Sequence, residues 1–152
     1  MESNRAEQTC DGIEKSRKHV EWILQKEQSN GIPANRIVIG GFSQGGALAL
    51  YTGLQQPVTY AGILAKSGYL ADTGNVTRVS EEAKNTPVHL FHGRSDDVVR
   101  HQWGVETADI VRRLGVKNVQ FKDYIGLGHS MNEQEIKDAT EWLKQILPSG
   151  HD

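Results

Sequence analysis

Short apolar segments alternate with longer helical patterns along most of this chain of 152 residues. Strands are predicted at 36–42, 60–66, 88–91 and 119–125, because these apolar runs are bounded by Gly, Pro or polar residues. Apolar residues at helical spacing predict helices at 9–29, 44–55, 101–115 and 132–147, with a short helix near 80–85. Strands that alternate with helices are typical of parallel βαβ units. The sequence therefore predicts one α/β domain over residues 1–152, built on a parallel sheet.

Three details of this pattern are specific enough to be checked against a structure. The continuous apolar character of 36–42 predicts a fully buried strand. The last helix is expected to bury one stripe of side chains, which are those of Ile136, Ala139, Leu143, Ile146 and Leu147. Residues 1–8 and 148–152 are expected to be frayed ends.

Charge and composition exclude several classes of function. Lys and Arg number 17 against 19 Asp and Glu, for a net charge of -2, so neither nucleic acid nor an anionic membrane is an expected partner. No apolar run is long enough for a membrane helix, and Met1–Gln8 lacks the apolar segment of a signal peptide. The single cysteine, Cys10, excludes an internal disulfide and a multi-cysteine zinc site. A cytoplasmic globular domain is the expectation.

The segment Gly41-Phe42-Ser43-Gln44-Gly45 is a G-x-S-x-G motif between a predicted strand and a predicted apolar helix. That context is typical of a nucleophile elbow, a tight turn that exposes a serine hydroxyl. The residues two before and two after the serine must then be small, and both are glycine. The N–H of Gln44, at the start of the helix, is the expected oxyanion donor. A plain glycine-rich turn is the competing interpretation, whereas a phosphate-binding loop lacks its Lys-Ser or Lys-Thr pair.

A nucleophilic serine needs a base and a carboxylate that orients the base, in the chain order serine, acid, histidine. Asp96 and Asp97 both follow the third predicted strand, where the acid belongs. His129 follows the fourth strand on a loop flanked by glycine, which makes it the predicted base.

The other five histidines have other expected roles. His92, at a strand end, is expected to make a structural hydrogen bond, and His89, inside a strand, is expected to pack in the core. His19, His101 and His151 are expected to be exposed. No group of His, Cys and carboxylate residues has the spacing of metal ligands, so no metal is predicted.

Three segments resemble the acyl-protein thioesterase and carboxylesterase group of α/β hydrolases. They are residues 31–47, which contain Gly-Phe-Ser-Gln-Gly-Gly, and residues 87–99 and 121–130. The resemblance implies a three-layer αβα hydrolase fold, with Ser43 as nucleophile, His129 as base and Asp96 as acid. It also implies hydrolysis of carboxylic-ester or thioester bonds of acyl substrates, such as S-acylated proteins or lysophospholipids, without a cofactor.

The sequence departs from that family in two respects. Family members often carry Pro directly after the acid, and Asp97 stands in that place here. The family also has earlier strands and a His-Gly loop with a second oxyanion donor, so this chain resembles the C-terminal two-thirds of the domain. The alternative to an active esterase is therefore an impaired hydrolase with a binding role. An uncovered edge on the 36–42 strand would also favour self-association.

Overall fold

The computed structural model describes residues 2–71 and 79–147, with side chains from Gly12 onward. The elements, in chain order, are α1 (Glu2–Ser29), η1 (Ala34–Arg36), β1 (Val38–Phe42), α2 (Gln44–Gly53), β2 (Gly62–Lys66), η2 (Ala83–Asn85), β3 (Val88–Gly93), α3 (His101–Arg113), β4 (Val119–Tyr124) and α4 (Glu133–Ile146). The four strands form one sheet in the order β1-β2-β3-β4, and every neighbouring pair is parallel. The predicted α/β fold with a parallel sheet is confirmed.

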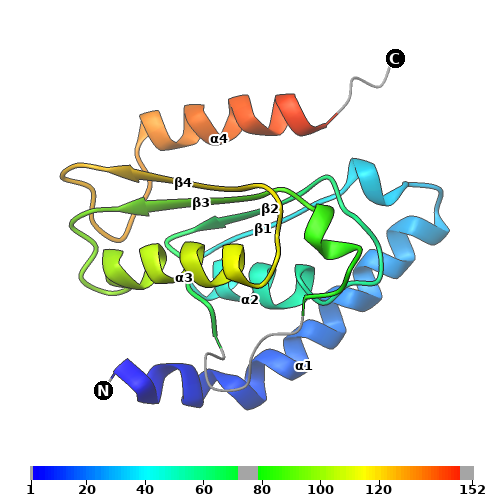
Figure 1. Cartoon of the computed structure of the whole chain (residues 1–152), viewed down its shortest axis with the longest axis horizontal. Helices are drawn as coiled ribbons and strands as arrows, with labels where there is room; N and C mark the ends of the chain where they lie inside the picture. Colours follow the sequence, from blue (N-terminus) through cyan, green and yellow to red (C-terminus); the bar gives the residue numbers. More distant parts are fainter. Residues whose placement is uncertain (1, 72–78, 148–152) are drawn as a thin grey trace.

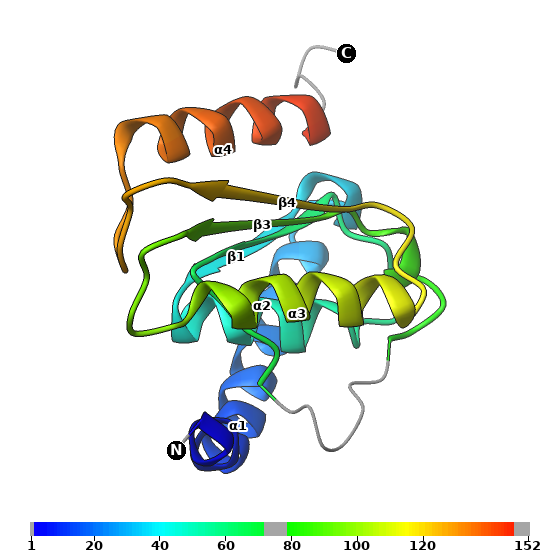
Figure 2. The same ribbon diagram turned by 60° about the vertical axis from the view of Figure 1, so that its left-hand side comes forward.

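Helices cover both faces of this sheet (Figure 1). α4 lies on one face, α2 and α3 lie on the other, and α1 packs outside α2, as the rotated view in Figure 2 also shows. Because all strands run the same way, their carboxyl ends meet along one edge of the sheet. In open parallel sheets this is the edge where functional loops gather.

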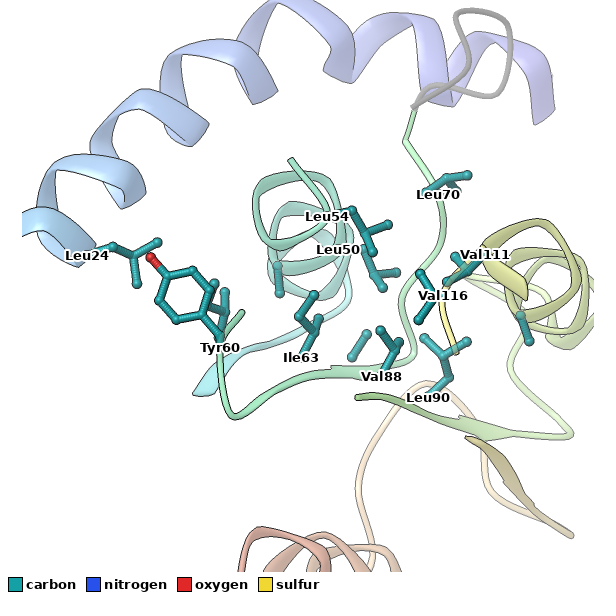
Figure 3. Packing of buried hydrophobic residues seen from close by; sticks show 14 residues of the cluster. Leu24, Leu50, Leu54, Tyr60, Ile63, Leu70, Val88, Leu90, Val111 and Val116 are labelled. Carbon is teal, nitrogen blue, oxygen red and sulfur yellow. The ribbon is translucent and has the colours of Figure 1, made fainter. Parts of the chain in front are cut away.

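The main core fills the space between the sheet, α2 and α3 (Figure 3). Leu50 of α2 and Leu54, which caps the end of this helix, are completely buried there with Ile63 of β2, and Val111 of α3 is buried as well. Leu24 of α1 belongs to the same cluster and lies beside Tyr60. α2 therefore lies between the sheet and another helix, which explains why its sequence is apolar on nearly all sides.

Several predicted boundaries shift in the structure. α1 begins at Glu2, so the expectation of a frayed start before residue 9 is wrong for all but the first residue, which is not described. β1 begins at Val38 because the preceding Ala34–Arg36 forms the turn η1. β4 ends at Tyr124, and the next residue, Ile125, is 83% exposed. The expectation of a frayed end at 148–152 lies outside the described residues.

β1 is only partly buried, which contradicts the prediction of a fully buried strand. Ile39 points into the main core, but Gly40 and Phe42 are exposed. The physical reason is the position of β1 at the edge of the described sheet, combined with the placement of α4. The cluster under α4 is built on Leu64, Phe91 and Tyr124 of the other three strands, so α4 leaves part of β1 uncovered.

The buried side of α4 overlaps the predicted stripe. Ala139 is buried, and Leu143 and Ile146 pack partly buried against the cluster under α4, as predicted. Ile136, expected inside, is instead 48% exposed, whereas Glu135 and Trp142 are buried. Gly62 of β2 makes room for this packing, because a Cβ there would lie 2.6 Å from Ile146 Cδ1 and 2.8 Å from Trp142 Cη2. The Glu135 carboxyl lies in the interior, where burial raises its pKa and neither oxygen has a partner among the described residues.

His89 packs in the core, as predicted. Its ring stacks on Phe91 at 4.1 Å between centroids and meets the edge of Trp142 at 5.2 Å. Burial lowers the pKa of His89 to about 4, because the charged ring would lose its hydration there.

We predict that the low pKa of His89 makes the fold acid-sensitive between pH 6.5 and 4. In this range the unfolded chain binds a proton at His89 that the folded chain excludes. The free energy of unfolding therefore decreases as the pH is lowered from 6.5 to 4, by up to about 3 kcal/mol. Urea titrations across this range should show a smaller loss in His89→Leu than in the wild type. If both proteins lost stability in parallel, His89 would not be the cause.

Candidate active site

Ser43 occupies a strained turn between β1 and α2. Its backbone adopts φ 59° and ψ -117°, a region that residues with side chains rarely enter. The Ser43 N–H donates to the carbonyl of Lys66 at 2.8 Å, which fixes the turn to the end of β2. α2 begins at the next residue, Gln44, whose N–H belongs to the first helical turn and so has no intrahelical acceptor. This is the geometry that the G-x-S-x-G motif predicts.

The two motif glycines do not have equal importance. A Cβ on Gly41 would lie 2.2 Å from the carbonyl carbon and oxygen of Gly45, so any side chain at Gly41 would force the turn apart. A Cβ on Gly45 would meet nothing within 4 Å. The expectation that both positions must be small is therefore correct for Gly41 and wrong for Gly45, because a Cβ on Gly45 would point away from the close approach.

The structure brings Ser43, His129 and Asp96 together from three loops at the carboxyl edge of the sheet. His129 Nε2 lies 3.0 Å from Ser43 Oγ, and His129 Nδ1 lies 2.8 Å from Asp96 Oδ2. Since a carboxylate only accepts, Nδ1 carries the proton and Nε2 is left to accept from the serine hydroxyl. The Phe42 ring lies 4.9 Å from the His129 ring and covers one side of it.

The two aspartates that follow β3 have different environments. The Asp96 side chain is completely buried, and its Oδ1 accepts from the N–H groups of Val98 and Val99, both at 2.9 Å. Its Oδ2 is thereby free to face His129. Asp97 is exposed to solvent. Of the two candidates that the sequence leaves open, only Asp96 contacts His129.

Backbone hydrogen bonds connect the two loops that carry Asp96 and His129. The loop after β3, which carries Asp96, is called the acid loop, and the loop after β4, which carries His129, is called the histidine loop. Ser95 N–H donates to the carbonyl of Leu127 at 2.9 Å, and Arg94 N–H donates to Tyr124 at 2.9 Å. Gly93 permits this contact, because a Cβ there would lie 2.1 Å from the Leu127 oxygen. The sequence analysis took glycines beside the predicted strands only as boundaries, whereas Gly93 is the last residue of β3, and a glycine within a strand can mark such a close approach.

A polar cluster that the sequence analysis missed lies behind the acid loop. His101 was expected to be exposed, but its ring is partly buried and its Nε2 lies 2.9 Å from Asp123 Oδ2. Arg94 Nε lies 3.1 Å from the same oxygen and is the main reason that the pKa of Asp123 is lowered. The predicted structural hydrogen bond of His92 is confirmed, since its Nε2 lies 2.7 Å from the Val99 carbonyl. His19 is exposed, as expected, and His151 lies outside the described residues.

Neither a metal centre nor a membrane span is found among the described residues. Over 12–71 and 79–147, no three His, Cys, Asp or Glu side chains converge as a metal-ligand set. None of the described helices combines the length and apolar character of a bilayer span. A hollow of about 270 Å³ between β4 and α4 lies apart from Ser43. It is lined by His89, Gln120, Phe121, Lys122, Asp138, Glu141, Trp142 and Gln145.

Comparison with known proteins agrees with this geometry. A family model described as phospholipase/carboxylesterase matches residues 1–147. Acyl-protein thioesterase 1 homolog 2 of Dictyostelium discoideum is 40% identical over 143 residues, which are 94% of this chain and 64% of the relative. Acyl-protein thioesterase 1 of Neurospora crassa is 41% identical over 140 residues, covering 90% of this chain and 57% of the relative.

A solved structure extends the likeness to three dimensions. The crystal structure of Arabidopsis thaliana SOBER1 matches with a TM-score of 0.85 at 34% identity, over 90% of this chain and 65% of that one. The chain thus spans 57% to 65% of the length of these three relatives. The match of the family model over nearly the whole chain shows that the protein belongs to the phospholipase/carboxylesterase family of α/β hydrolases.

Proposed function

We propose that this chain is a serine hydrolase that cleaves carboxylic-ester or thioester bonds of acyl substrates. The observation that carries the proposal is the contact of His129 Nε2 with Ser43 Oγ at 3.0 Å, at a strained turn, while Asp96 accepts from Nδ1. Two relatives named acyl-protein thioesterases agree with this chemistry.

In the proposed reaction Ser43 Oγ attacks the acyl carbonyl as His129 Nε2 takes the hydroxyl proton. The carbonyl oxygen becomes an oxyanion, which the N–H of Gln44 would bind at the start of α2. Collapse of the tetrahedral intermediate breaks the bond to the leaving alcohol or thiol, and His129 returns the proton to that group. Water, deprotonated by His129, then attacks the acyl-serine. The bond between the acyl carbon and Ser43 Oγ breaks, His129 returns the proton to Oγ, and the carboxylic acid leaves.

Asp96 is proposed to hold His129 in the tautomer that this reaction needs. A proton on Nδ1 leaves Nε2 able to accept, and the buried carboxylate stabilises the imidazolium that forms during attack. The N–H groups of Val98 and Val99 compensate the buried charge from the other side. This chemistry uses only side chains, a backbone N–H and water, so the proposal includes no cofactor.

The proposed substrates are S-acylated proteins and lysophospholipids, in keeping with the names of the family and of its thioesterase members. We also infer a cytoplasmic location. The single cysteine cannot form a disulfide within the chain, so the fold does not depend on one, as is usual for proteins of reducing compartments.

A further proposal concerns a second copy of the chain at β1. β1 lies at an edge of the described sheet, and it carries neither Pro nor a charged residue. Because Ser43 N–H bonds Lys66, the alternation of a parallel strand turns the backbone polar groups of Val38, Gly40 and Phe42 away from β2. Such an edge favours pairing between chains. The alternative function is that of an impaired hydrolase that acts by binding, and β1 would then be the surface through which it binds.

We predict that Asp96→Asn lowers turnover of a simple aryl ester by about 10⁴-fold, because an amide can stabilise the wrong tautomer of His129. Asp97→Asn is the matched control and should retain nearly all activity, since Asp97 is exposed. Ser43→Ala should abolish turnover of both an aryl ester and an acyl thioester. Equal losses in the two aspartate variants would overturn the role of Asp96. A folded wild type without turnover would favour the interaction role.

Self-association through β1 predicts a sedimentation coefficient that rises with protein concentration. Gly40→Lys should suppress the rise, because it places a charge on the exposed edge strand, while the atom nearest to a Cβ there would be the Leu64 oxygen, at 3.4 Å. A concentration-independent monomer would contradict the proposal. So would association that the lysine leaves unchanged.

A further inference from the structure

Val99 of the acid loop makes hydrogen bonds through both of its backbone polar groups. Its N–H donates to Asp96 Oδ1 at 2.9 Å, and its carbonyl lies 2.7 Å from His92 Nε2. Val99 itself is completely buried beside Ala47 of α2. The position of the Asp96 carboxylate is thus connected, through Val99, to the ring of His92 at the end of β3.

The proton arrangement of His92 follows from this contact. A backbone carbonyl only accepts, so Nε2 must carry a proton and donate it to Val99. The side chain is 2% exposed, and burial lowers the pKa of His92, which favours the neutral ring. The same Nε2 lies 3.5 Å from Asp96 Oδ2, too far for a good hydrogen bond but close enough for its N–H dipole to attract the carboxylate.

α3 leaves room for the His92 ring in this orientation. A Cβ at Gly104 would lie 2.6 Å from His92 Nδ1, so only glycine allows the ring to pack there. The His92 ring also lies 6.1 Å, between centroids, from the ring of His101 at the start of α3, and His101 is in turn held by Asp123. The His92 ring is therefore packed against α3, with its donor directed at Val99.

We propose that His92 is a positioning residue that holds Asp96 in place for His129 by donating to the Val99 carbonyl. This inference rests on the proposed function for its effect on catalysis. His92 touches neither the substrate nor the reacting atoms. It acts through the acid loop, and its loss lets the Asp96 carboxylate move away from His129 Nδ1.

The matched substitutions are His92→Gln and His92→Met, which have similar length and volume. Gln retains an N–H donor at roughly the reach of Nε2, whereas Met has none. We expect His92→Met to lower kcat for an aryl ester about tenfold to hundredfold with KM nearly unchanged, because a small misplacement of a catalytic group costs rate rather than binding. His92→Gln should restore most of kcat.

A second readout does not depend on turnover. The proton that His129 Nδ1 shares with Asp96 should give a far-downfield proton resonance, assigned by its loss in Asp96→Asn. We expect the resonance in the wild type and in His92→Gln, and a shifted or absent one in His92→Met. An inactive chain that still shows this pattern would refute the proposed function while supporting the role of His92.

Gly104→Ala tests the same contact from α3. Alanine favours a helix, so the change should not weaken α3 itself, yet its Cβ should displace the His92 ring and reproduce the loss of kcat and of the resonance. Wild-type kcat and resonance in a folded His92→Met protein would overturn the proposal. So would unfolding of both His92→Met and Gly104→Ala, which would assign His92 to the fold rather than to the site.

Discussion

The turn at Ser43 depends on a close approach between two backbones, in which Gly41 at the end of β1 passes directly against Gly45 at the start of α2. No side chain fits at Gly41, and Ser43 between them accepts a positive φ of 59°. Such strain persists only where the surrounding structure over-determines it. The bond from Ser43 N–H to Lys66 and the burial of α2 between the sheet and α1 supply that restraint.

The rest of the site follows from the parallel sheet. All four strands end at the same edge, so the loops after β1, β3 and β4 can meet there although Ser43 and His129 are far apart in sequence. The loops are fixed to one another by main-chain bonds, of which Ser95 to Leu127 is an example, and Gly93 admits that contact. A preorganised arrangement of this kind suits the proposed acyl transfer, because groups already aligned need little reorganisation during such a reaction.

Much of this arrangement could be predicted from the sequence. The order of strands and helices follows from local periodicity, and the residues after each strand end are then the candidates for the site. The position after the third strand left both Asp96 and Asp97 open, and the family resemblance implied Asp96. In the structure only Asp96 contacts His129, because its side chain is turned inward while Asp97 is exposed. Packing between different elements was not predicted, because local periodicity does not specify which side chains meet across the fold. Trp142 and Ile146 pack over Gly62 while Glu135 is buried, and the pairing of His101 with Asp123 joins residues from α3 and β4.

The most direct test of this account is chemical labelling of the nucleophile. A fluorophosphonate probe reacts with a serine whose oxygen is activated by a neighbouring base, and peptide mapping by mass spectrometry locates the adduct. The account predicts one adduct per chain, on Ser43, and no labelling of Ser43→Ala. An adduct on another serine, or labelling that persists in the alanine variant, would contradict the assignment of Ser43 as the nucleophile.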